Sequence, residues 1–227
     1  SVSVLASSGC NTLQILPAGS LGRSYQTVSF WSGRTELLGV VGFIAAQNNT
    51  LVDIEIPSDS EARFMLNGIE LSKYNPIARV ALEELDTLHF VELNKVDFSG
   101  IRISSNTRIG VFCGMVGSIQ MMLPMNAWGY KYFLLPLLSQ NPYDIRVLTN
   151  ESNTTLSIQG TPCISDCLIP SNVTVVISAT KPIMVVQYFL PSDPSFNDTV
   201  SMVHVPPVES YLSKYSFITQ NNASVHI

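Results

Sequence analysis

Apolar residues recur at every second position in several short segments of this sequence, and this alternation restricts the chain to a fold built from β-strands. Segments 51–56, 143–148 and 155–158 alternate, and segment 182–189 is rich in β-branched and aromatic residues, as a buried strand is. Thirteen prolines and thirteen glycines interrupt the chain at short intervals. We expect an all-β fold of short, mostly antiparallel strands in sandwich-like layers, with one helix over residues 77–85.

The chain also repeats itself, in the same order in both copies. The matching pairs are residues 16–25 with 123–132, 49–54 with 153–158, and 103–109 with 177–183. The spacing between copies shrinks along the chain, which indicates an insertion of about 30 residues in the first copy. We therefore expect tandem repeated units: a first unit over 1–118 with an acidic insertion at about 57–97, a second over 119–204, and the start of a third, incomplete unit over 205–227.

The composition excludes several classes of protein. Charged residues make up 13% of the chain and hydrophobic residues 46%, so disorder is not expected. The net charge is −5 and no run of lysine or arginine occurs, which argues against a nucleic-acid partner. The longest uncharged stretch, 109–130, contains glycines and a proline, so it predicts two short strands with a turn and no membrane span.

Two sequence features indicate an extracellular protein. The first is a set of six Asn-x-Ser/Thr sequons, at Asn48, Asn150, Asn153, Asn172, Asn197 and Asn222. The second is the even number of cysteines: we expect Cys163 to pair with Cys167, which leaves Cys10 to pair with Cys113. The alternative of a zinc site is disfavoured because the three histidines have no matching spacing. We expect no metal site.

Several ordered motifs resemble those of the IgG-Fc-binding protein N-terminal domain family. They are Asp97–Asn106 followed by Ile109–Phe112, Leu123-Pro124 with Trp128-Gly129 and Tyr143–Val147, then Lys181–Tyr188 and Val205–Tyr211. The resemblance covers about residue 20 to the end of the chain. It implies an extracellular module of mucus, matrix or cell-surface proteins that acts in adhesion or binding, without implying Fc binding itself.

The sequence also departs from the pattern of that family. The family often places a cysteine, a histidine and acidic residues before the Leu-Pro block, whereas this chain has Gly117–Met122 there. Cys113 stands where the family usually has a small polar residue. The disulfide pattern is therefore expected to be particular to this protein.

No catalytic motif emerges, so we do not expect an enzyme. Segment 19–22 falls short of Gly-x-Ser-x-Gly because Ala18 precedes it, and His89 and His204 suit strand positions. Ten acidic and four basic residues lie between Asp53 and Asp97. A solvated face explains this acidity, and no cofactor is expected. The alternative is a calcium site, for which the candidate ligands are Glu83, Glu84 and Asp86, or Asp193 and Asp198.

Aromatic residues recur near the start of each copy. Core packing is the default role, and Trp31, Trp128 and Tyr130 are the candidates for a binding face. Our first hypothesis is a secreted, glycosylated, non-catalytic module that binds other extracellular proteins. The alternatives are a filament subunit whose incomplete third unit is completed by a donated strand, and a carbohydrate-binding module.

Overall fold

The computed structural model describes residues 4–8, 11–30, 39–115, 118–135, 143–163, 174–189 and 201–214, and every structural statement below concerns these residues. Strands dominate them, and they contain no α-helix, so the all-β prediction is confirmed. The strands are β1 (Val4–Ser8), β2 (Asn11–Ile15), β3 (Gly22–Gln26), β4 (Gly39–Ala45), β5 (Thr50–Glu55), β6 (Phe64–Leu66), β7 (Ile69–Leu71), β8 (Ile77–Leu82), β9 (Thr87–Val91), β10 (Arg102–Met115), β11 (Ser118–Met121), β12 (Gly129–Leu134), β13 (Tyr143–Thr149), β14 (Leu156–Ile158), β15 (Thr161–Cys163), β16 (Val175–Phe189) and β17 (Ser201–Val205). Three short 3₁₀ helices complete the list: η1 (Ala18–Ser20), η2 (Met125–Ala127) and η3 (Val208–Ser210).

The prediction of a helix over residues 77–85 is wrong. Residues Ile77–Leu82 form β8, which pairs antiparallel with β5. Leu85 lies in the following turn with φ of +68°. Helix-favouring residues such as Ala, Arg and Leu fill this segment, but pairing with the edge of β5 satisfies its backbone and overrides that local preference.

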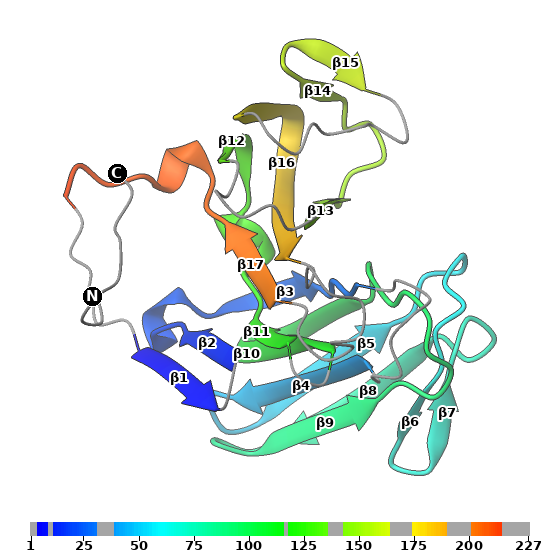
Figure 1. Ribbon diagram of the computed structural model, residues 1–227. Helices are drawn as coiled ribbons and strands as arrows, with labels where there is room; N and C mark the ends of the chain where they lie inside the picture. The colour runs from blue at the N-terminus through cyan, green and yellow to red at the C-terminus, as the bar shows by residue number, and fades with distance from the viewer. Residues whose placement is uncertain are drawn as a thin grey trace.

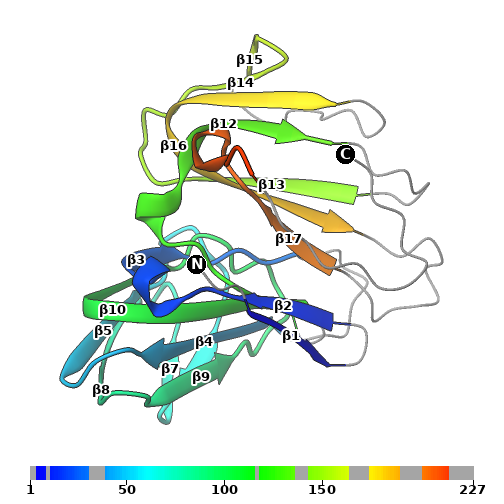
Figure 2. The ribbon, with the colours of Figure 1, turned by 90° about the vertical axis from the view of Figure 1, so that its left-hand side faces the viewer.

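The fold is built mainly from two large antiparallel sheets. The seven-stranded sheet has the order β8-β5-β10-β4-β9, with β3 and β11 also paired to β10. The six-stranded sheet has the order β12-β16-β14-β15, with β13 and β17 also paired to β16. Hairpins β1-β2 and β6-β7 stand apart from both. The six-stranded sheet lies above the seven-stranded one in the views of Figures 1 and 2.

Each large sheet is organised around one long strand that changes partners halfway. The first half of β10 lies between β3 and β5, and its second half lies between β4 and β11. In the same way, β16 has β12 and β14 on its first half, then β13 and β17 on its second. This exchange of partners lets each sheet curl over its own apolar side chains.

The main core runs through both sheets. It contains Phe43 and Ile103 of the seven-stranded sheet and Phe64 of the β6-β7 hairpin, together with Met184 and Tyr188 of the six-stranded sheet. The rings of Phe30 and Tyr188 lie 5.1 Å apart, centroid to centroid. A second, smaller cluster lies within the six-stranded sheet, around Tyr132 and Ile177. Apolar contact therefore joins the two sheets as well as filling each of them.

A proline-headed 3₁₀ helix recurs three times. Pro17, Pro124 and Pro207 are the N-cap residues of η1, η2 and η3, with ψ of 150°, 152° and 151°. Proline suits this position because its fixed φ prepares the turn and its missing N–H needs no partner. After η1 and η2 the chain enters β3 and β12, respectively.

A buried tyrosine hydroxyl ties the start of β3 to β10, and another ties the start of β12 to β16. Tyr25 Oη accepts a hydrogen bond from the backbone N–H of Gly22 (2.7 Å) and donates one to the carbonyl of Ile109 (2.7 Å). Tyr132 Oη makes the same two bonds, with the N–H of Gly129 and the carbonyl of Ile183. Burial raises the pKa of both phenols, and that of Tyr132 to about 12, so each hydroxyl keeps the proton that it donates.

The units stack through a contact between glycine and proline. A Cβ on Gly22 would lie 2.3 Å from Cβ of Pro124, and a Cβ on Gly129 would lie 2.2 Å from Cβ of Pro207. Each 3₁₀ helix therefore sits directly on the strand that follows the previous 3₁₀ helix, with η2 on β3 and η3 on β12. We call the contact of η2 with β3 the first junction, and that of η3 with β12 the second junction.

Replacing Gly22 by alanine tests this stacking. We expect Gly22→Ala to lower the free energy of unfolding by about 1–3 kcal/mol, because the methyl group must displace the Pro124 ring. Gly19→Ala is the matched control, since nothing lies within 4 Å of its Cβ position. Urea unfolding of both variants measures the effect, and equal stabilities would contradict the stacking.

Candidate functional site

Of the three aromatic candidates from the sequence, one is buried, one is exposed and one lies outside the described residues. Trp128 is 7% exposed, and its Nε1 donates to the carbonyl of Leu123 at 3.4 Å, so its proposed place on a binding face is wrong. It belongs to the main core because it follows η2 at the junction. Tyr130 is 48% exposed, and its backbone N–H bonds Glu209. Trp31 lies outside the described residues.

The described cysteine side chain is a free thiol. Cys113 is fully buried in β10, where its Sγ lies 3.3 Å from the carbonyl oxygen of Val28 and 2.9 Å from Sδ of Met122. This arrangement contradicts the predicted bridge to Cys10, because the thiol points into the core beside those two residues. Cys10 and Cys167 lie outside the described residues, as does the side chain of Cys163, so the bridge between Cys163 and Cys167 stays a prediction.

The state of Cys113 has a direct chemical test. Burial raises the pKa of this thiol to about 12, so it is un-ionised at neutral pH. We expect iodoacetamide to leave Cys113 unmodified in the folded protein and to alkylate it fully in 6 M guanidinium without reductant, as read by peptide mass spectrometry. Alkylation that requires prior reduction would instead show that Cys113 forms a disulfide.

The described sequons are accessible. Asn48, Asn150 and Asn153 are exposed, as glycan attachment requires. Asn48 lies in the turn before β5, where its Oδ1 accepts a bond from the N–H of Glu84 (3.0 Å). Asn172, Asn197 and Asn222 lie outside the described residues. Glycosylation of all six stays a prediction.

The carboxylates considered for calcium serve the turn after β8. Asp86 Oδ2 accepts the N–H of Glu83 at 2.9 Å, and Glu83 Oε2 accepts the N–H of Asn49 at 3.2 Å. Across the described ranges, no group of three or more His, Cys, Asp and Glu residues is placed to hold a metal. Asp193 and Asp198 lie outside them.

The motif Asp97-Phe98-Ser99 fastens the end of the acidic insertion to the segment after β3. Asp97 Oδ1 accepts bonds from the hydroxyl of Ser29 (2.9 Å) and the N–H of Ser99 (2.8 Å). Its other oxygen lies 3.2 Å from Nη1 of Arg146 on β13, so the same carboxylate links the two sheets. This motif therefore has a structural role.

The acidic insertion presents the most distinctive surface. It projects the hairpin β6-β7, whose two-residue turn Asn67-Gly68 has positive φ at both positions, as a type I′ turn requires. On the outer side, Arg63 makes a bidentate ion pair with Glu70, with both distances 2.8 Å. This pairing lowers the pKa of Glu70 and keeps both side chains charged.

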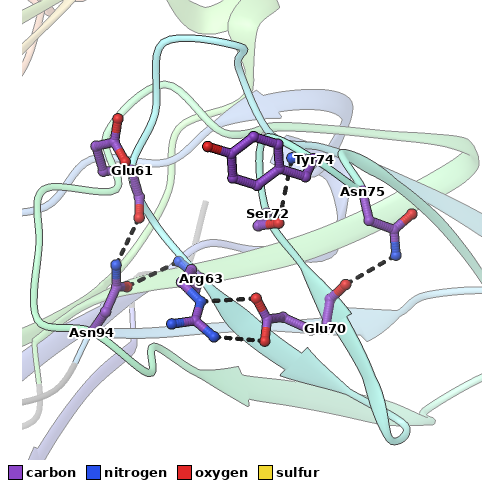
Figure 3. Close-up of polar contacts among 7 residues, drawn as sticks. All are labelled: Glu61, Arg63, Glu70, Ser72, Tyr74, Asn75 and Asn94. Carbon is purple, nitrogen blue, oxygen red and sulfur yellow. Dashed lines mark hydrogen bonds and ion pairs between the residues drawn. The ribbon is translucent and has the colours of Figure 1, made fainter.

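Tyr74 stands at the centre of this surface (Figure 3). Its side chain is 87% exposed. The turn that carries it is fixed by reciprocal backbone bonds between Ser72 and Asn75, at 3.2 and 3.0 Å. Asn75 Nδ2 also donates to the carbonyl of Glu70 at 2.9 Å. A shallow hollow of about 330 Å³ lies beside the ring.

The charges around Tyr74 are already paired. Lys73 bonds Glu61, and its Nζ lies 5.4 Å from the centre of the Tyr74 ring. Asn94 accepts the N–H of Arg63 and donates to the carbonyl of Glu61 (Figure 3). An exposed aromatic ring on a fixed turn, with satisfied polar groups around it, is an arrangement suited to a protein-binding hot spot. We call these residues the Tyr74 surface: Glu61, Arg63, Glu70, Ser72, Lys73, Tyr74, Asn75 and Asn94.

A buried histidine in the six-stranded sheet is the clearest source of pH sensitivity. His204 on β17 is partly exposed as a residue, but both ring nitrogens are inaccessible to solvent and have no hydrogen-bond partner among the described residues. Desolvation lowers the pKa of His204 to about 4. The folded protein therefore holds this ring neutral.

This histidine should make stability depend on acid. The unfolded chain binds a proton at His204 near pH 6.5 and the folded chain near pH 4, so stability is lost as pH falls through that window. We expect wild type to lose about 1–2 kcal/mol more than His204→Phe between pH 7 and pH 5. Urea unfolding at both pH values measures this difference, and parallel losses would contradict it.

Fold and surface together define an all-β module suited to protein binding. The chain belongs to the IgGFc binding protein family, whose sequence model matches residues 11–227. Searches of curated proteins and of solved structures returned no significant match. Members of the family are typically extracellular. Within the described part of the chain, no helix is long and apolar enough to cross a membrane.

Sequence reasoning placed the insertion but missed Tyr74. The acidic excess between Asp53 and Asp97 marked the right region, yet charge alone indicated only a solvated face. The one available signal was a tyrosine before Asn75-Pro76 in a polar stretch, which is typical of an exposed turn. The ion pairs around the ring form only when the folded hairpin brings Arg63 to Glu70 and the turn brings Lys73 to Glu61. The sequence does not reveal these neighbours.

Proposed function

We propose that this chain is a non-catalytic protein-binding module that acts in extracellular assemblies such as mucus, matrix or cell-surface adhesion. Membership of the IgGFc binding protein family supports a protein partner. Exposure of the three described sequons supports an extracellular setting, because each is accessible to glycosylation. Binding would depend on surface complementarity, without a reacting residue.

The Tyr74 surface is the single observation that supports this function most. Because the turn that carries Tyr74 is already fixed by backbone bonds, binding has to order the side chain of this tyrosine but not its backbone. The ion pairs at Arg63 and Lys73 are made within the module, so a partner need not supply counter-charges. Met65 is 45% exposed and lies opposite Glu70 in the hairpin, which adds exposed apolar area to the insertion.

The test compares two exposed tyrosines. The immobilised chain is probed with purified IgG Fc and with a panel of purified secreted proteins, and dissociation constants are measured for each partner that binds. We expect Tyr74→Ala to weaken binding at least about tenfold, as loss of a central aromatic contact does. Tyr130→Ala is the matched control, since Tyr130 is exposed but lies at the second junction.

Tyr74→Phe separates the ring from its hydroxyl and should retain most of the affinity. Equal binding by wild type and Tyr74→Ala would exclude the Tyr74 surface. Loss confined to Tyr130→Ala would move the binding face to the second junction. Absence of binding to every protein in the panel would argue against the proposed function.

The other two sequence hypotheses gain less support. The filament hypothesis requires another chain to donate a strand to the incomplete third unit over 205–227, and the residues of that unit beyond 214 lie outside the described ranges. A sugar-stacking face centred on Trp128 conflicts with the burial of that side chain.

A further inference from the structure

An open, polar cleft lies at the first junction, far along the chain from the Tyr74 surface. It has a volume of about 600 Å³ and is formed by η1, the start of β3, the middle of β10 and η2. Its exposed side chains are those of Ser20, Arg23, Ser24, Arg108, Asn126 and Ala127. None of the residues that line it is acidic or aromatic.

The two arginines in the cleft differ from the other arginines in the described ranges. Four of the six described arginines pair with a carboxylate: Arg63 with Glu70 (2.8 Å), Arg79 with Asp53 (2.6 Å), Arg102 with Glu55 (3.9 Å) and Arg146 with Asp97 (3.2 Å). The guanidinium groups of Arg23 and Arg108 have no such partner among the described residues. Two unpaired cations in one cleft of a chain with net charge −5 make a local site for an anion.

The second junction shows that folding does not require these arginines. Alignment of the two junctions places Tyr130 at the position of Arg23, Pro182 at that of Arg108 and Glu209 at that of Asn126. The tyrosine bonds and the glycine–proline contact are nevertheless the same at both. The pair of arginines is therefore particular to the first junction, whereas the second junction has one lysine, Lys131, at the position of Ser24. The arginines are added to a frame that forms without them.

We propose that this cleft binds an acidic saccharide, through a sulfate or carboxylate group held between Arg23 and Arg108. The planar guanidinium groups suit either oxyanion, and the hydroxyl of Ser24 and the amide of Asn126 can bond the neighbouring sugar hydroxyls. An acidic peptide is a poorer fit because the exposed lining offers no large apolar side chain as an anchor.

Calorimetric titration of the whole chain tests the site with four probes. They are a heparin-derived octasaccharide, a hyaluronan octasaccharide, a neutral octasaccharide and a poly-glutamate peptide. We expect binding of one or both acidic saccharides, weakened by added salt, and none of the neutral one. Hyaluronan carries carboxylates alone and heparin carries sulfates as well, so binding of hyaluronan shows that a carboxylate is sufficient, and binding of heparin alone shows that sulfate is required.

Three variants locate the binding. The double variant Arg23→Gln/Arg108→Gln should weaken it at least about tenfold, as removal of charge-assisted bonds does. Asn126→Glu keeps both arginines but introduces the carboxylate found at the second junction, and should have a similar effect. Arg102→Gln is the control, because it removes one positive charge outside the cleft from the strand that also carries Arg108, and it should leave binding unchanged.

Several results would overturn the proposal. These are no binding of either acidic saccharide, equal loss in Arg102→Gln, unchanged affinity in the double variant, or poly-glutamate binding as tight as the saccharides. Thermal unfolding of each variant confirms that it is folded. Because the Tyr74 surface lies on the insertion, failure of one site leaves the test of the other intact.

Discussion

The contact of a 3₁₀ helix with the strand that follows the previous 3₁₀ helix is the constraint on which the rest of the structure depends. Glycine at the start of that strand lets a proline ring approach the backbone, and a buried tyrosine hydroxyl bonds both that glycine and the long strand behind it. Because these groups are buried, losing one partner would leave another polar group unsatisfied. The junction therefore fixes the turn, the first strand and the long strand together.

Each junction depends on one glycine, one proline and one tyrosine, so the positions around these three residues are free to vary. The first junction carries Arg23 and Asn126 where the second carries Tyr130 and Glu209, and both keep the same backbone bonds. The first unit also accommodates the insertion with the Tyr74 surface, because β8 and β9 add to the outer edges of its sheet. Binding features can thus differ between units without disturbing the core.

Much of the fold could be predicted from the sequence because alternating apolar and polar residues are typical of half-buried β-strands. Strand β5 and strand β13 lie where the period-two segments placed them. Segment 77–85 was misread because its residues favour a helix in isolation, whereas pairing with β5 decides its structure. Cys113 was assigned to a bridge by counting, but the side-chain direction of β10 turns its thiol into the core.

The sequence by itself determined the all-β class, the order of the recurring motifs and the position of the acidic insertion, since each follows from local pattern or self-similarity. Only the tertiary structure decided which residues could act. It buried Trp128, exposed Tyr74 and brought Arg23 and Arg108 into one cleft from distant parts of the chain. The physical reason is that burial and charge pairing depend on which strands become neighbours, and residues far apart in the sequence set those neighbours.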